Sequence, residues 1–394
     1  MVMTALDGLR IRQALDLARG SFGLTEPNPR VGCVLSRNDG TVIGVGATQA
    51  AGEAHAEVMA LRDARATGES VSGATAWVTL EPCSHHGRTP PCCDALIEAG
   101  ISRCVIALPD PFLVAGGSGT GIARLRAAGI EVEVVECVGL IAQAREVNIG
   151  FLSRVERGRP WVRVKSAASA DGRLGLMNGA SKWITGVAAR ADGHAWRRRA
   201  SAVLTGIGTV LADDPRLDVR ALPTPRQPMR VVLDTRLRLP LDAALFAPQG
   251  EVIVVSAPGQ AQRAQALRAQ GAQVWDDWDE DAMPALGSVL QRLAARGVNE
   301  LHVEAGPTLA GSLWQAGLVD EWLIYLAPML LGPGLPMVQA TAFEALSQAQ
   351  RFCWHSTDAI GDDLRLRLVS HGYGFGRWTV SNLSADFTDT ARLK

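Results

Sequence analysis

Three short stretches in the first quarter of the chain carry residue types suited to metal chemistry. His55-Ala56-Glu57 opens an expected helix, Glu81-Pro82-Cys83 follows an expected strand, and Pro90-Pro91-Cys92 leads into another helix. One imidazole and two thiolates form a ligand set for Zn²⁺ that leaves a fourth position open for water, which is typical of a catalytic zinc site. The sequence therefore predicts a zinc centre held by His55, Cys83 and Cys92.

Glu57 stands two positions after the histidine and has no place in that ligand set. Zinc lowers the pKa of a bound water to about 7, so a nearby carboxylate can carry a proton from the water to a departing nitrogen. Zinc nucleobase deaminases use a glutamate in this way, although their cysteines follow a C-x-x-C spacing. Cys83 and Cys92 are nine positions apart, and we expect the polar loop 84–89 between them to contact substrate.

Other interpretations of these residues remain open at this stage. Cys93 could replace Cys92 as the ligand, and a purely structural zinc is a second alternative, although such sites normally have four protein ligands. His85 and His86 either contact substrate or are ordinary loop residues. Two further cysteines lie in apolar stretches and are expected to be small core residues, Cys33 and Cys104.

Helix and strand patterns alternate around these stretches and predict a three-layer α/β unit that ends near Asn148. We expect strands at 31–35, 41–45, 75–80, 103–108 and 130–136, with helices at 11–18, 55–66, 92–99 and 122–128. Residues 149–160 are interpreted as a connection to a second α/β unit. Its expected strands are 161–165, 202–205, 230–233, 251–256, 300–304 and 321–325, and its expected helices are 188–199, 260–269, 286–295 and 308–316.

The second unit carries weaker motifs. Gly206-Ile207-Gly208-Thr209 lacks the third glycine of a dinucleotide fingerprint and is interpreted as an ordinary tight turn. Glu304-Ala305-Gly306-Pro307-Thr308 places a small loop between a strand and a helix, where free backbone N–H groups suit a phosphate. By residue type alone, Arg197 and Arg220 would be solvated surface charges.

Composition and charge narrow the class of protein. The chain has 394 residues, 47% of them hydrophobic, with 39 basic against 40 acidic residues. This balance argues against a nucleic-acid-binding protein, which usually has a dominant basic face. We find no apolar run of membrane-spanning length and no signal-peptide pattern at Met1–Asp7, and the seven cysteines are an odd number. We therefore expect a cytoplasmic protein with no membrane partner.

At this point the motifs resemble a known family, the bifunctional deaminase–reductases of riboflavin biosynthesis. The resemblance rests on Pro27–Val34, His55–Glu57 and Thr79–Cys92, and extends to about Leu368. It implies a cytidine-deaminase-like three-layer α/β domain at 1–148, a linker at 149–160, a dihydrofolate-reductase-like α/β domain at 161–370, and a flexible tail at 371–394. The implied activities are deamination of a pyrimidine ribonucleotide, then NADPH-dependent reduction of its ribosyl group to ribityl.

The resemblance also implies particular site residues in the second domain. NADPH would be held by Ala167, Trp183, Thr209, Asp213, Gly306, Pro307 and Thr308. The substrate would be held by Ser181, Arg197, Leu217, Arg220 and Glu304, with the arginines suited to its phosphate. A homo-oligomer, dimer or tetramer, is expected on the same basis.

Three other functions remain open, one of them because of a departure from the family. Asp110-Pro111 continues into Phe112-Leu113 where the family usually has an asparagine near the deaminase pocket. A reductase with a damaged deaminase is therefore one alternative. A nucleic-acid base deaminase is another, although it leaves the second half of the chain unexplained. A non-catalytic scaffold with a relic zinc site would have no use for Glu57.

Overall fold

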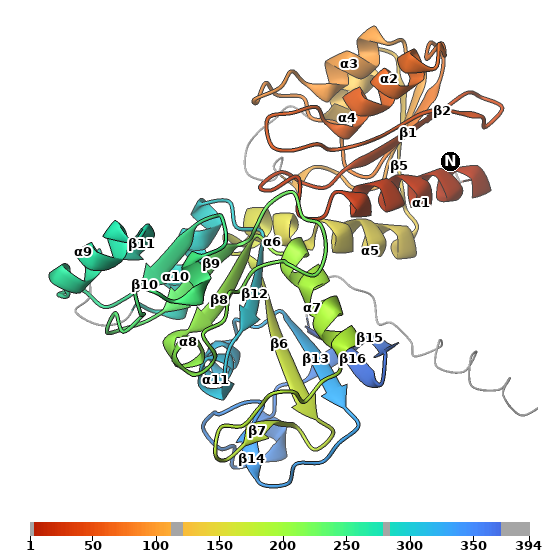
Figure 1. The fold of residues 1–394 in the computed structure, drawn as a ribbon. Helices are drawn as coiled ribbons and strands as arrows, with labels where there is room; N and C mark the ends of the chain where they lie inside the picture. The colour runs from red at the N-terminus through yellow and green to blue at the C-terminus, as the bar shows by residue number, and fades with distance from the viewer. Residues whose placement is uncertain (1–3, 112–120, 279–283, 372–394) are drawn as a thin grey trace, which may run out of the picture.

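Two α/β units make up the chain in a computed structural model that describes residues 4–111, 121–278 and 284–371. The units lie at opposite ends of the view in Figure 1, and helix α6 (Ile149–Arg157) lies between them. Both units of the predicted fold class are therefore present. The Phe112-Leu113 departure and the expected tail from residue 372 onward lie outside the described residues.

The first unit is a sheet covered by helices on both faces. Its strands have the order β2 (Val42–Ala47), β1 (Gly32–Ser36), β3 (Thr75–Val78), β4 (Arg103–Ile106) and β5 (Glu131–Val134). The pairs β1–β2 and β1–β3 are antiparallel, whereas β3–β4 and β4–β5 are parallel. In Figure 1, α2 (Ala56–Ala66), α3 (Cys92–Glu98) and α4 (Gly121–Ala127) cover one face, and α1 (Ala5–Gly20) and α5 (Val138–Val147) lie across the other.

A larger sheet forms the second unit. Its order is β11 (Ala272–Trp275), β10 (Val252–Val255), β9 (Met229–Leu233), β8 (Ala202–Gly206), β12 (Glu300–Glu304), β6 (Trp161–Ser169), β13 (Glu321–Ala327), β16 (Asp363–Ser370) and β15 (Phe352–Ile360). The strands from β11 to β13 pair in parallel, and β16 and β15 add an antiparallel edge. The remaining elements are β7 (Arg173–Leu176), β14 (Gly334–Pro336), α7 (Val187–Arg199), α8 (Ile207–Asp213), α9 (Ala261–Ala269), α10 (Leu286–Ala295) and α11 (Pro307–Gln315).

Every predicted helix and strand is found, with bounds shifted by a few residues. One interpretation was wrong: Gly206-Ile207-Gly208-Thr209 is not a tight turn, because Gly206 caps the start of α8. Ile207 and Val210 are spaced as neighbours on one helical face, and both are buried in an apolar cluster. Burial of that face therefore favours helix at a segment whose two glycines suggested a turn.

The connection at 149–160 is largely the helix α6, and it packs tightly against the second sheet. A Cβ atom built on Gly150 would lie 2.4 Å from Cγ of Glu300 and 2.7 Å from the backbone of Asn299. Only glycine permits so close an approach of a helix to a strand. The first residues of α6 are therefore fixed against β12.

Charged residues cross the junction between the units. Arg30 of the first unit lies 2.6 Å from Glu300 of β12, and Arg199 and Arg163 bind the same carboxylate at 2.7 and 2.9 Å. All four side chains are buried. Burial alone would raise the pKa of Glu300, but the three guanidinium groups lower it to about 2. The junction therefore contains a paired, ionised network.

Candidate functional site

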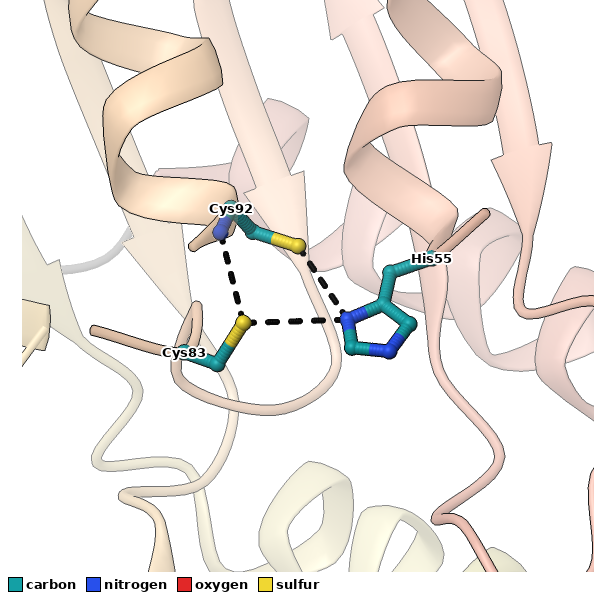
Figure 2. Close-up of side chains that lie close together, drawn as sticks. All are labelled: His55, Cys83 and Cys92. Carbon is teal, nitrogen blue, oxygen red and sulfur yellow. Dashed lines mark hydrogen bonds between the residues drawn. The ribbon is translucent and has the colours of Figure 1, made fainter. Parts of the chain in front are cut away.

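Three predicted metal ligands come together on the side of the first sheet that α2 and α3 cover. His55 is the cap of α2, Cys83 lies in the loop after β3, and Cys92 is the first residue of α3. Figure 2 shows that Nδ1 of His55 points at both sulfur atoms, at 3.7 Å from Cys83 and 3.3 Å from Cys92. The three ligand atoms all lie within 4.8 Å of one another.

This triangle has the dimensions that zinc requires. With Zn–S bonds of about 2.3 Å and Zn–N bonds of about 2.1 Å, a tetrahedral site separates sulfur from nitrogen by about 3.6 Å. The observed separations of 3.3 and 3.7 Å lie on either side of that value. The side chains present therefore fit a zinc ion with one further position for a small ligand.

The two ligand thiols differ in pKa because they lie against each other. A hydrogen bond from Cys92 lowers the pKa of Cys83 to about 4, while that same contact and burial raise the pKa of Cys92. Zinc ligands must be thiolates, so metal binding displaces the remaining proton. The neighbouring Cys93 turns away, because its sulfur donates to the carbonyl of Pro82 at 3.2 Å. The geometry thus supports Cys92 over the alternative ligand Cys93.

Glu57 lies in the first turn of α2 and is 3% exposed. Burial raises its pKa to about 7, and the negative charge of Cys83 acts in the same direction. A carboxyl group with a pKa near the working pH both accepts and returns a proton readily. The structure therefore places a group suited to proton transfer beside the proposed metal ligands.

A cavity of about 290 Å³ opens onto this cluster. Both His55 and Glu57 line it, and so do four residues of the polar loop, His85, Gly87, Arg88 and Thr89. His86 is not among the lining residues. The rest of the lining is Pro27, Asn28, Pro29, Val31, Thr48, Gly52, Leu80, Glu81, Cys83, Asp110, Phe151 and Arg154.

Glu81 also lines this cavity, and its carboxylate has a structural use. Its carboxylate accepts backbone N–H bonds from Asp110 at 3.1 Å and from Ile122 at 3.0 Å. Those bonds tie the end of β4 and the start of α4 to the loop that carries Cys83. Glu81 therefore holds the walls of the cavity in place through both of its oxygens.

The second unit gathers predicted residues at the carboxyl ends of its central parallel strands. Glu304 ends β12 and receives two bonds from Arg197 of α7, at 2.5 and 2.8 Å. Thr205 at the end of β8 donates to the carbonyl of Glu304 at 2.7 Å. On the other side of β12, Lys165 of β6 stands opposite Glu304 in the strand register. Ligands of open α/β sheets bind at this edge.

Burial alone would raise the pKa of Glu304, but the Arg197 guanidinium lowers it well below its usual range. Burial lowers the pKa of the adjacent His302 to about 3 and lowers that of Lys165 as well. Glu304 is therefore an ionised carboxylate paired with the cationic Arg197, and the imidazole of His302 next to them is neutral.

Five of the seven residues expected to hold NADPH lie on or next to helices that begin at the same edge. Gly306 caps α11, Pro307 is its first residue, and Thr308 bonds Gln339 at 3.1 Å. Thr209 and Asp213 belong to α8, and Asp213 pairs with Lys182 at 3.1 Å. Ala167 lies in β6, and the ring of Trp183 is 70% exposed under the guanidinium of Arg190.

The expected substrate residues are only partly brought together. Arg197 also donates to the carbonyl of Asp218 at 2.9 Å, and Arg220 pairs with the side chain of Asp218 at 2.7 Å. Leu217 is buried with a left-handed backbone (φ 53°), so its side chain belongs to the core. Ser181 lies in the loop between β7 and α7, and no bond to the Arg197–Glu304 pair is found for it among the described residues.

Sequence reasoning missed several residues at both sites. Phe151 and Arg154 line the first cavity from α6, and Asp218 organises both arginines of the second site. Asp218 could have been suspected, because it lies between Leu217 and Arg220. Phe151 and Arg154 have no such signal, since the sequence of residues 149–160 indicates only a connection.

Comparisons with known proteins agree with this geometry. Residues 7–108 match the family model of the cytidine and deoxycytidylate deaminase zinc-binding region, and residues 160–370 match that of the RibD C-terminal domain. The riboflavin biosynthesis protein RibD of Escherichia coli K12 is 41% identical over 384 residues, covering 92% of this chain and 99% of the relative. That of Aquifex aeolicus VF5 is 38% identical over 359 residues, covering 91% and 97%.

Two solved structures extend the similarity to the whole fold. The Acinetobacter baumannii RibD structure in form 1 superposes with a TM-score of 0.83 at 42% identity, covering 92% of this chain and 98% of that one. A Thermotoga maritima diaminohydroxyphosphoribosylaminopyrimidine deaminase/5-amino-6-(5-phosphoribosylamino)uracil reductase superposes with a TM-score of 0.82 at 32% identity, covering 93% and 99%.

Proposed function

The chain belongs to the RibD family of riboflavin-biosynthesis proteins, and from that membership we propose that its two sites act in turn on one pyrimidine ribonucleotide. The protein is a bifunctional enzyme with a zinc-dependent deaminase and an NADPH-dependent reductase, as its sequence predicts. Membership favours this two-step enzyme over the nucleic-acid deaminase and the scaffold. The observation that carries the proposal is the His55–Cys83–Cys92 triangle with Glu57 buried in the same cavity.

The first reaction is hydrolytic removal of the 2-amino group of 2,5-diamino-6-ribosylamino-4(3H)-pyrimidinone 5′-phosphate. Zinc supplies Lewis acidity, which makes water a nucleophile at neutral pH. His55, Cys83 and Cys92 hold the metal. Glu57 accepts the proton of the attacking water on its carboxylate and delivers it to the departing nitrogen, so that ammonia leaves and a carbonyl remains. Loop 84–89 and the Pro27–Pro29 segment enclose the pyrimidine.

The second reaction reduces the ribosyl group of 5-amino-6-(5-phosphoribosylamino)uracil to ribityl. NADPH supplies the hydride. We assign cofactor binding, as the family resemblance implies, to Ala167, Trp183, Thr209, Asp213, Gly306, Pro307 and Thr308. This assignment is supported by α8 and α11, which directly follow the parallel strands β8 and β12 and carry or adjoin five of these residues. We assign substrate binding to Ser181, Arg197, Leu217, Arg220 and Glu304. Because the side chain of Leu217 is buried, this residue would contact the substrate through its backbone. The arginines suit a phosphate, and the ionised Glu304 suits a sugar hydroxyl.

Three finer points belong to the same proposal. The domain boundaries are 1–148 and 161–370, with α6 between them. A homo-oligomer is supported by the open edge strand β15, where Trp354 is 53% exposed.

A cytoplasmic location is supported by the seven cysteines, all free thiols in the structure. Among the described residues, none of the helices has the length and hydropathy needed to cross a membrane.

Mass spectrometry of the diaminopyrimidine substrate, incubated with zinc-loaded protein with and without NADPH, tests the proposal. We expect exchange of one amino group for oxygen without NADPH, and a gain of two hydrogens once NADPH is added. If the protein reduces supplied deaminated intermediate but leaves the starting compound untouched, the departure at Phe112 has disabled the first site. If neither reaction occurs, the proposed function is wrong.

A further inference from the structure

Helix α6 contributes to the deaminase cavity although it lies outside both regions matched by the family models. Phe151 and Arg154 line the cavity together with His55 and Glu57. The matched regions end at residue 108 and resume at residue 160. The wall that α6 provides is therefore an addition to the deaminase region, supplied by the segment that leads into the reductase.

Arg154 is held in a defined position by residues of both units. Its Nε donates to Oδ1 of Asn299 at 2.6 Å, and its Nη2 donates to the carbonyl of Pro27 at 3.1 Å. The guanidinium lies 5.6 Å from the centroid of the Phe151 ring. Asn299 is fixed in turn, because its Nδ2 donates to Glu26 at 2.6 Å and to Pro27 at 3.1 Å.

These anchors leave one end of the guanidinium available. The hydrogen bonds of Arg154 to the described residues use Nε and Nη2, so Nη1 remains for a ligand in the cavity. A pre-positioned arginine binds an oxyanion with less loss of side-chain freedom than a mobile one. Arg154 is therefore a half-buried, held side chain that lines the cavity and has one amino group free of hydrogen bonds to the described residues.

The other arginine of the cavity differs in this respect. Arg88 stands on the polar loop, is exposed, and makes no hydrogen bond to the part of the chain that the structure describes. The substrate carries a phosphate dianion, whose strongest protein partner is a guanidinium. Of the two arginines that line the cavity, only Arg154 is positioned before the substrate arrives.

Resting on the proposed function, we propose that Arg154 binds the 5′-phosphate of the deaminase substrate. The connecting helix, positioned by Asn299 of the second unit, thereby completes the first active site. Arg154 is a binding and specificity residue for deamination, and Asn299 is its positioning residue. Neither takes part in proton transfer, which belongs to Glu57.

Deamination kinetics of Arg154→Gln in the full, zinc-loaded chain test this proposal. The substrate is compared with its dephosphorylated form. We expect KM for the phosphorylated substrate to rise about tenfold or more, since a charge-assisted hydrogen bond is lost. The change in kcat is expected to be small, and KM for the dephosphorylated form to stay the same. Arg154→Lys should give an intermediate KM, because lysine keeps the positive charge but lacks the planar guanidinium that binds two phosphate oxygens at once.

Arg157→Gln is the matched control. Arg157 lies on the same helix, pairs with Asp320 at 2.8 Å, and is not among the residues that line the cavity. It should leave the KM for deamination unchanged. Reduction of supplied intermediate, measured for each variant, reports on folding of the second unit and should be retained in Arg154→Gln.

Binding is measured apart from turnover by calorimetry in the Glu57→Gln background. Adding Arg154→Gln should weaken binding of the phosphorylated substrate about tenfold. Unchanged affinity, or equal weakening for the phosphorylated and dephosphorylated forms, would overturn the assignment to the phosphate. Absence of deamination by the unmodified enzyme would instead contradict the proposed function, so the two failures are distinguishable.

Discussion

The two active sites each contain a largely buried glutamate, and the surroundings give the two carboxyl groups opposite properties. Burial raises the pKa of Glu57 to about 7, and the anionic Cys83 adds to the effect. Burial would do the same to Glu304, but Arg197 lowers its pKa well below the usual range. The charge of the neighbours therefore decides whether a buried carboxyl group carries protons or remains a fixed anion.

The proton-carrying role of Glu57 gives the largest expected effect. Glu57→Gln preserves the shape of the side chain but removes the base, so deamination should fall by about 10²–10⁴-fold. Metal analysis should still find one zinc per chain, because the three ligands remain. Reduction of supplied intermediate should be unaffected. Deamination at the unmodified rate would show that another group carries the proton.

The same substitution in the other site should have a smaller effect on a different reaction. Glu304→Gln removes a fixed negative charge and one partner of Arg197, so kcat/KM for reduction should fall by about 10- to 100-fold. Deamination serves as the internal control and should not change. If both activities fall in a folded protein, the two sites are not independent, and the separate roles given to Glu57 and Glu304 are wrong.

The pH dependence of reduction sharpens the contrast. Because the pKa of Glu304 is lowered in the folded state, its pairing with Arg197 is fully present above the unfolded pKa of about 4.3 and is lost only as the pH falls further. Rates measured from pH 8 down to pH 5 should therefore show no loss due to Glu304. In Arg197→Gln, burial remains without the guanidinium, so the acidic limb of the pH–rate profile should move to higher pH. An acidic limb at the same pH in both proteins would show that Arg197 does not lower the pKa of Glu304.

A third glutamate, Glu81, should give the smallest change in chemistry. Glu81→Gln replaces an oxygen that accepts a backbone N–H bond, so the free energy of unfolding should fall by about 1–2 kcal/mol. Thermal unfolding measures this loss. Deamination should fall much less than in Glu57→Gln. A comparable loss of deamination, with stability unchanged, would mean that Glu81 acts in proton transfer.

The two sites also differ in how much the sequence could reveal. The metal ligands are residue types with few other uses, and they stand in short motifs at the ends of predicted strands and helices. The second site combines ordinary residues from Ala167 to Thr308, and without the family resemblance Arg197 would have been assigned to the surface. The pairing of Arg197 with Glu304 depends on contacts across more than one hundred residues, which no local pattern contains.

Local patterns failed where tertiary packing decides the outcome. Gly206 and Gly208 suggested a turn, yet burial of Ile207 and Val210 produces α8. Residues 149–160 read as a connection, since nothing in their sequence indicates that Gly150 packs against β12 or that Arg154 reaches Asn299. The fold class and the first site could be predicted, whereas the junction could not.

The ionised network at that junction has a consequence for how the enzyme melts. Separating the units would remove Arg30 from Glu300 and expose the rest of the network to water. Breaking a buried ion pair by losing one member costs about 3–5 kcal/mol. Neither half can then open without destabilising the other. Heating should therefore give one cooperative calorimetric transition for both halves, in contrast to the separate transitions of two independently folding modules.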